Sequence, residues 1–120
     1  MSVIRRYANE VAVRFQPEKI ILFGSYACGK PHADSDVDIL VVMSARNEMD
    51  QAVRIDRAID PPFPLDLIVR KPKTLAWRLK EGDSFLREIL ANGKVLYEKT
   101  DQGMGAKGRS RLSSSRVARN

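Results

Sequence analysis

The sequence predicts an α/β (α+β) fold in which a small mixed β-sheet is flanked by helices. Short apolar segments with the length of buried strands alternate with longer segments whose apolar residues recur at helical spacing. The first two predicted strands are joined by a loop too short for a covering helix of ordinary length, whereas a helix separates the second strand from the third. The short connection indicates that not all strands run parallel, so the sheet is expected to be mixed.

The first half of the chain contains one predicted helix and two predicted strands. Residues 2–15 predict an amphipathic helix, which Pro17 ends. The apolar residues that recur at helical spacing in it are Val3, Ile4, Tyr7, Val11 and Phe15. A short apolar run predicts a buried strand over 19–23, and the Gly-Ser pair after it indicates a turn. A loop rich in Gly, Pro and Asp then leads to the strongest strand candidate, residues 37–42.

The second half alternates in the same way. The predicted elements are a helix over 45–59, a strand over 64–70, helices over 72–81 and 84–91, and a last strand over 94–98. A pair of prolines breaks the first of these helices. Pro72 suits a first helical turn, and Asp83 suits an N-cap. Trp77 and Tyr97 are expected to lie in the core.

Composition excludes several classes of protein. Hydrophobic residues make up 43% of the 120 residues, which is enough for a globular core. No apolar run has the length of a membrane helix, and the charges spread through the first fifteen residues are unlike a secretory signal. A single cysteine and a single histidine exclude an internal disulfide and a zinc site with the usual ligands. We therefore expect a cytoplasmic protein without membrane contact.

The excess positive charge is concentrated at the C-terminal end. Residues 1–99 hold 16 basic and 14 acidic side chains, whereas residues 100–120 hold five basic and one acidic. The second segment is rich in Gly, Ser and Arg and has too few apolar residues for a core, which predicts a flexible basic tail. We expect residues 1–99 to form one domain, and only the tail to offer an electrostatic contact with nucleic acid.

Three aspartates interrupt apolar strands and form the candidate catalytic and metal-binding group. Asp36 and Asp38 are two residues apart, so both carboxylates point to the same face of a strand. Asp66 lies inside the next predicted strand, and if the two strands are neighbours, all three carboxylates meet at one spot. Like charges at that distance are unfavourable unless a cation is bound. Ligands that are all oxygen favour Mg²⁺ or Mn²⁺.

A glycine and a serine directly after the first strand form the candidate nucleotide-binding turn. Gly24 allows the backbone to approach a ligand closely, and exposed N–H groups at such a turn suit phosphate oxygens. Ser25 adds a hydroxyl donor. A phosphate-binding turn next to a carboxylate cluster indicates metal-assisted phosphoryl or nucleotidyl transfer.

These residues also have purely structural interpretations. Asp36 could belong to a capping turn, and Ser25 could be only a helix N-cap. Cys28 is interpreted as a small packing residue. Lys30 and His32 are interpreted as solvated loop residues.

The spacing of the motif resembles a known superfamily. Gly24-Ser25, ten residues and then Asp36-Val37-Asp38 give the pattern GS-x10-DxD, and Asp66 follows on a later strand. In these residues the chain resembles the nucleotidyltransferases that include DNA polymerase beta, poly(A) polymerases and aminoglycoside nucleotidyltransferases. Its ending, SFLREILANGKVLYE, resembles the minimal nucleotidyltransferases, the MntA-type antitoxins encoded beside HEPN-domain (HepT-type) toxins. The resemblance spans residues 1–99 and implies a polymerase beta-like palm fold.

The resemblance also implies roles for these residues. Asp36 and Asp38 are similar to the pair that coordinates two Mg²⁺ ions, and Asp66 to the carboxylate that completes the shell of the catalytic ion and helps to deprotonate the attacking hydroxyl. Gly24 and Ser25 are similar to the turn that holds the triphosphate of ATP.

The implied activity is transfer of AMP from ATP to a tyrosine hydroxyl of a cognate HEPN toxin, so that the chain is an antitoxin. Two alternatives stay open: a non-catalytic antitoxin that acts by complex formation, and a stand-alone nucleotidyltransferase acting on RNA or a small molecule. The sequence does not indicate which nucleotide is preferred, because no residue clearly reads a base.

Overall fold

The computed structural model describes residues 2–99, and its helices and strands follow the predicted order. They are α1 (Ser2–Phe15), β1 (Lys19–Phe23), β2 (Val37–Val42), α2 (Glu48–Ala58), β3 (Leu65–Arg70), α3 (Pro72–Lys80), α4 (Ser84–Asn92) and β4 (Lys94–Glu98). The predicted basic tail, 100–120, lies outside the described residues.

Helix α2 differs most from its predicted range of 45–59. It begins at Glu48 because the side chain of Asn47 accepts a hydrogen bond from the backbone N–H of Asp50 at 3.0 Å and caps the helix. It ends at Ala58 because Ile59 has an extended backbone conformation. Helical spacing shows that a helix exists, but the capping contacts decide where it begins and ends.

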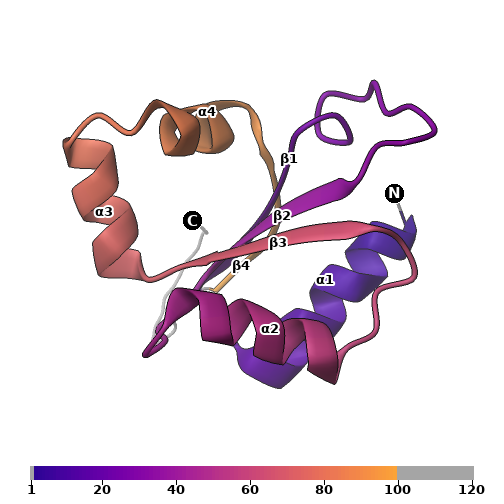
Figure 1. The fold of residues 1–120 in the computed structure, drawn as a ribbon, viewed down its shortest axis with the longest axis horizontal. Helices are drawn as coiled ribbons and strands as arrows, with labels where there is room; N and C mark the ends of the chain where they lie inside the picture. Colours follow the sequence, from indigo (N-terminus) through magenta and orange to yellow (C-terminus); the bar gives the residue numbers. More distant parts are fainter. Residues whose placement is uncertain (1, 100–120) are drawn as a thin grey trace, which may run out of the picture.

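The sheet is mixed, as predicted, and its strands lie in the order β3-β2-β1-β4. Strand β1 runs antiparallel to both β2 and β4, whereas β2 and β3 are parallel. Helix α2, the helix predicted between the second and third strands, forms the crossover that connects the two parallel strands. The sheet runs through the centre of the molecule with helices on both sides (Figure 1).

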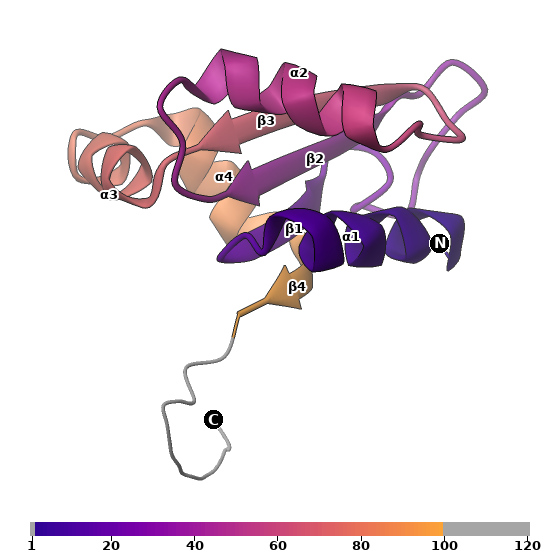
Figure 2. The same ribbon diagram turned by 90° about the horizontal axis from the view of Figure 1, so that it is seen from below.

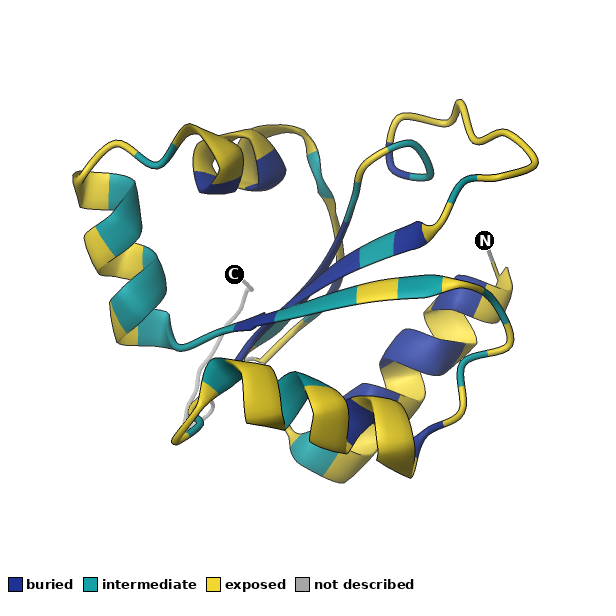
Figure 3. Ribbon diagram, viewed as in Figure 1, coloured by how far each residue is buried: buried dark blue, intermediate teal, exposed yellow. Residues whose placement is uncertain are grey.

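Helices α1 and α2 cover one face of the sheet and enclose the larger core. This core contains Ile4, Tyr7 and Val11 of α1, Ile39 of β2 and Ile55 of α2, all buried. Figure 2 shows α1 and α2 on the same side of the strands, and Figure 3 shows the buried inner side of α1. Tyr97 packs against this core, as the sequence predicted.

Helices α3 and α4 lie over the opposite face and cover it less completely. The smaller core here consists of Ile21, Leu40, Val42, Leu86 and Ile89. Helix α3 contributes no buried residue to it and contacts it through partly buried leucines. The prediction that Trp77 lies in the core is therefore wrong: its side chain is 59% exposed.

Among the described residues, no helix is long and apolar enough to cross a bilayer.

The end of α4 is fixed tightly against β1. Gly93 follows the helix, and a Cβ added to it would lie 2.6 Å from the side chain of Ile21 and 3.0 Å from the carbonyl oxygen of Leu22. Only glycine allows this close approach of backbone to strand. The contact holds α4 beside the end of β1, where the candidate nucleotide-binding turn begins.

Candidate active site

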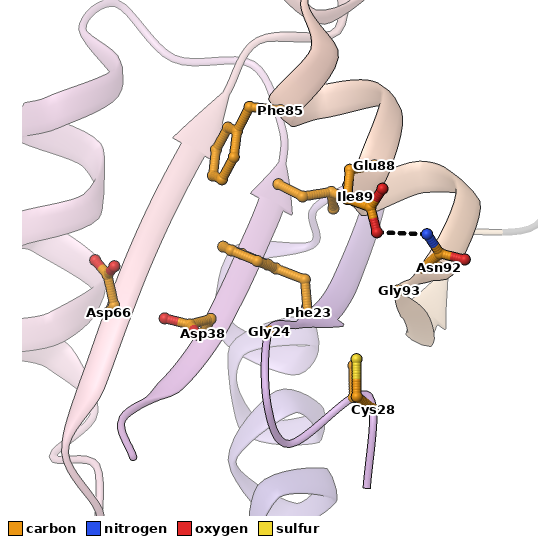
Figure 4. A pocket seen from close by; sticks show the side chains of 11 residues that line it. Phe23, Gly24, Cys28, Asp38, Asp66, Phe85, Glu88, Ile89, Asn92 and Gly93 are labelled. Atoms are coloured by element: carbon orange, nitrogen blue, oxygen red, sulfur yellow. Dashed lines mark hydrogen bonds between the residues drawn. The ribbon is translucent and has the colours of Figure 1, made fainter. Parts of the chain in front are cut away.

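Asp38 and Asp66 lie side by side on adjacent parallel strands. Asp38 is the second residue of β2 and is paired in register with Asp66 of β3 on one side and with Phe23 of β1 on the other. Leu40 follows Asp38 by two residues and packs in the smaller core, so the carboxylate points to the α4 face. The two strands are therefore neighbours, which is the condition on which the expected meeting of their carboxylates depended. Figure 4 shows both carboxylates on this face of the strands.

Asp36 lies just outside β2, in the exposed loop that leads into it. The turn before it is closed by Ser35, whose backbone N–H donates to the carbonyl of His32 at 2.9 Å and whose hydroxyl accepts from the His32 N–H at 2.9 Å. Asp36 therefore does not cap this turn. Because Asp36 lies outside the strand, strand alternation does not fix the direction of its side chain.

The negative charges act on one another. Burial, and then the charges of Asp66 and Asp36, raise the pKa of Asp38 above its ordinary value. Among residues 2–99, no side chain forms a hydrogen bond or salt bridge with any of the three aspartates. The charge of Asp38 is thus uncompensated by the protein, which is the electrostatic situation that a bound cation relieves.

In the structure the three carboxylates do not converge on a single point. In the part of the chain that the structure describes, no group of three or more His, Cys, Asp or Glu side chains is arranged to hold an ion. Asp38 and Asp66 are brought together by strand pairing, whereas Asp36 stands at the entrance to β2. The donor chemistry nevertheless fits Mg²⁺, because all three side chains offer carboxylate oxygens.

The turn after β1 brings backbone against Asp38. Gly24 has φ +76°, and a Cβ added to it would overlap the Oδ2 of Asp38. The turn is closed by hydrogen bonds from the N–H groups of Ala27 and Cys28 to the Gly24 carbonyl, both at 3.1 Å. No helix begins here, so the interpretation of Ser25 as a helix N-cap is wrong. Among the described residues, the N–H groups of Ser25 and Tyr26 have no backbone acceptor, which leaves them available to phosphate oxygens.

A pocket of about 430 Å³ connects Gly24, Asp38 and Asp66 with helix α4, whereas the predicted site residues Ser25 and Asp36 are not among the residues that line it. The strands and the turn contribute Phe23, Gly24, Ala27, Cys28, Asp38 and Asp66, and the helix and its end contribute Phe85, Glu88, Ile89, Asn92 and Gly93. Its volume is in the range of small-molecule sites, about 300–1,000 Å³. The pocket therefore has an acidic side, formed by the strands, and a side formed by α4 (Figure 4).

The α4 side was not predicted from the sequence. Phe85, Glu88 and Asn92 follow one another at spacings of three and four residues, so they share a helix face. The shared helix face could be inferred from that spacing, but nothing in the sequence indicated that this face lies opposite the aspartates. Cys28 also differs from its interpretation as a packing residue, because it is exposed and lines the pocket. Lys30 and His32 are exposed loop residues, as predicted.

The raised pKa of Asp38 predicts how stability depends on pH. The folded protein binds the proton of Asp38 more tightly than the unfolded chain, so the ionised carboxylate destabilises the fold. This loss is absent below the ordinary pKa of 3.8 and complete once the pH exceeds the folded value. We expect Asp38→Asn to raise the free energy of unfolding at pH 7 without divalent ions, and the gain to shrink as the pH falls toward 3.8. Urea unfolding at several pH values measures it.

The exposed Asp34, in the loop before the motif, provides the control. Asp34→Asn should leave the free energy of unfolding nearly unchanged over the same pH range. If Asp38→Asn lowers stability at pH 7 and Asp34→Asn does not, then Asp38 makes a stabilising contact and the assignment of uncompensated charge is wrong.

Paired strand carboxylates beside a glycine turn and a pocket are the arrangement expected of a protein that acts on phosphate esters. The comparison with protein families then identifies the family of this protein. The chain belongs to the polymerase beta nucleotidyltransferase family, whose model matches residues 6–102. The family predicted from the GS-x10-DxD pattern and the later Asp66 is thereby confirmed.

Individual relatives agree with this assignment. The chain is 29% identical over 98 residues to a protein of Methanocaldococcus jannaschii named "Putative protein adenylyltransferase MJ0604", and the match covers 80% of this chain and 96% of that one. The fold is similar to the crystal structure of "a putative nucleotidyltransferase from Sulfolobus solfataricus", with a TM-score of 0.56 and 22% identity, over 82% of this chain and 79% of the other.

Two solved toxin-antitoxin structures share the fold as well. One is of a mutant of the toxin-antitoxin MntA-HpeT, at 20% identity, and the other is of a toxin-antitoxin with AMP-PNP, at 23% identity. Each has a TM-score of 0.52 and covers 81% of this chain and 75% of the other chain. At these identities the likeness establishes the common fold.

Proposed function

We propose that this nucleotidyltransferase transfers AMP from ATP to a tyrosine hydroxyl of a HEPN-domain toxin, with Mg²⁺ as cofactor, and thereby acts as the antitoxin. The name of the M. jannaschii relative supports a protein as the acceptor, and the toxin-antitoxin structures support a toxin as that protein. The structure with AMP-PNP supports an ATP-like donor. The acceptor tyrosine and the HEPN fold of the partner follow from the sequence resemblance.

One observation carries the proposal: the register pairing of Asp38 with Asp66, beside Gly24 and inside one pocket. The carboxylates of two neighbouring strands offer oxygens that can bind a cation, and the turn that begins at Gly24 offers free backbone N–H groups. A nucleoside triphosphate requires both kinds of group together, because its phosphates need hydrogen-bond donors and its charge needs a cation.

Each residue then has a defined task. Asp36, Asp38 and Asp66 would hold Mg²⁺, which when bound neutralises the phosphates and activates the attacking hydroxyl. The N–H groups of Ser25 and Tyr26 orient the triphosphate. The tyrosine oxygen forms a bond to the α-phosphorus, the bond from this phosphorus to the β-bridging oxygen breaks, and pyrophosphate leaves. Asp66, which is exposed on the edge strand, would receive the hydroxyl proton.

The close approach of Gly24 to the Asp38 carboxylate can be tested by adding a single methyl group. In Gly24→Ala the new Cβ would overlap the Asp38 carboxylate, and rotation of that side chain out of the pocket relieves the overlap. We expect AMP transfer to fall about 100-fold, the loss that a displacement of about 1 Å causes in a catalytic site. The initial rate of transfer measures the effect.

Gly29 is the matched control, because it has φ +74° and a Cβ added to it meets no atom within 4 Å. Gly24→Ala and Gly29→Ala should therefore lose similar stability, about 1–2 kcal/mol for a left-handed backbone. Equal transfer rates in the two variants would contradict the close approach of Gly24 to Asp38.

The proposal predicts that the gene of this chain has a neighbour that encodes a HEPN-domain protein. Intact-mass spectrometry of that protein, after incubation with this chain, ATP and Mg²⁺, tests the acceptor directly. The proposal predicts that the partner gains the mass of one or more AMP groups, and that Asp38→Asn abolishes the gain while Asp34→Asn does not. A stable complex without any change in mass would support the non-catalytic antitoxin instead.

A further inference from the structure

The pocket extends well beyond the groups that the transfer reaction uses. Its aspartates and the Gly24 turn account for phosphates and cations, but the rest of the pocket presents the ring of Phe23 from β1 and, from α4, the ring of Phe85 and an amide–carboxylate pair. None of these side chains has a task in the reaction described above. The nucleoside part of ATP, in turn, has not yet been given a place.

The aromatic part consists of Phe85 and Phe23. Their rings stand almost perpendicular, with an interplanar angle of 85° and centroids 5.7 Å apart. Phe23 is partly buried against the smaller core, which holds it in place, whereas Phe85 is 50% exposed. Half of a large apolar side chain thus lies open beside a pocket, and its free ring face is suited to stacking with a base.

The polar part lies one to two turns further along the same helix face. Asn92 donates a hydrogen bond from its side-chain nitrogen to the Glu88 carboxylate at 2.5 Å. Both residues line the pocket (Figure 4). A carboxylate accepts hydrogen bonds and donates none, so Glu88 favours a base edge that carries an amino group and repels one that carries a carbonyl. Adenine has an amino group at position 6, whereas hypoxanthine and guanine have a carbonyl there.

We propose that the α4 side of the pocket is the nucleobase subsite, in which Phe85 stacks on the base and Glu88 selects adenine by its 6-amino group. The inference rests on the proposed function, because it places the base of the same ATP whose phosphates lie at Gly24 and Asp38. It assigns the nucleotide preference that the sequence alone left open. Phe85 and Glu88 contact only the base, so they act on affinity and selectivity and not on the chemical step.

The test compares three probes by titration calorimetry on the full chain with Mg²⁺: ATP, ITP and tripolyphosphate. ATP and ITP differ at position 6 of the base, and tripolyphosphate has no base. Phe85→Ala should weaken ATP binding about 10-fold or more and leave tripolyphosphate binding unchanged. Phe85→Tyr should restore ATP binding, because it keeps the aromatic face. Glu88→Gln should reduce the preference for ATP over ITP, because its amide can donate to a carbonyl.

Leu90→Ala is the matched control on the same helix, because Leu90 is 38% exposed and does not line this pocket. It should leave the affinity for all three probes unchanged. If Phe85→Ala and Leu90→Ala bind ATP equally well while the wild-type chain still transfers AMP, the subsite is wrong and the proposed function stands. If Phe85→Ala weakens ATP binding but the wild-type chain modifies no partner, the subsite stands and the proposed acceptor is wrong.

Discussion

Asp38→Asn is expected to lower the rate of AMP transfer by at least about 100- to 1,000-fold, the loss typical for removal of one group that stabilises developing charge. Asparagine has nearly the same shape as aspartate, but its amide carries no charge for Mg²⁺. The partner strand carboxylate, Asp66, cannot replace it, because Asp38 alone lies between Asp66 and the Gly24 turn. Initial rates at saturating ATP and Mg²⁺, with the partner protein as acceptor, measure the loss.

The same substitution is expected to leave the fold intact, or to stabilise it, because it removes the charge whose pKa is raised by burial and by Asp66 and Asp36. Asp34→Asn again serves as the control and should transfer AMP at the wild-type rate. A rate within a few-fold of wild type for Asp38→Asn, in a folded protein, would remove Asp38 from the catalytic group.

Ile55→Ala is expected to reduce the free energy of unfolding by about 2–5 kcal/mol. Ile55 is fully buried at 0% exposure and is the one residue of α2 that is buried. Its side chain joins α2 to the larger core, and truncation leaves a cavity there. A domain of this size has only about 5–15 kcal/mol of stability in total, so the melting temperature should fall markedly.

Val53 lies on the same helix and is 45% exposed, which makes Val53→Ala the matched comparison. Its effect on unfolding should stay within about 0.5 kcal/mol, as for most surface substitutions. Similar losses in the two variants would show that α2 is not attached to the sheet through Ile55.

The order of helices and strands could be predicted because each element carries its own local pattern. Strand 37–42 is bounded by turn residues and strongly apolar, and the range β2 has in the structure is the same. The ends of α2 were less accessible, because they depend on one hydrogen bond to Asn47 and on the extended backbone of Ile59. Trp77 was misplaced because spacing shows which residues share a helix face, whereas the distance of α3 from the sheet is set by tertiary contacts.

The candidate site also contains residues that the local sequence indicates and residues that depend on long-range contacts. Gly24, Ser25 and the aspartates could be proposed from the sequence because glycine after a strand and charge within a strand are unusual locally. Of these residues, Gly24, Asp38 and Asp66 line the pocket. The sequence placed Asp66 inside a strand but did not indicate that this strand, β3, lies at the edge of the sheet, where Asp66 is exposed. The α4 side of the pocket depends on Gly93, whose lack of a side chain lets the helix end approach β1. Such a long-range contact leaves no periodic signal in the sequence.

The central claim is that this pocket transfers the AMP part of ATP to a protein. The most direct measurement incubates the chain and its partner protein with Mg²⁺ and ATP labelled with ³²P either at the α- or at the γ-phosphate. Transfer of AMP predicts that label enters the partner only from the α-phosphate, while the γ-label is released as pyrophosphate. Label from the γ-phosphate on the partner would mean phosphoryl transfer, and no label from either position would mean that the complex is non-catalytic; both results would contradict the proposed reaction.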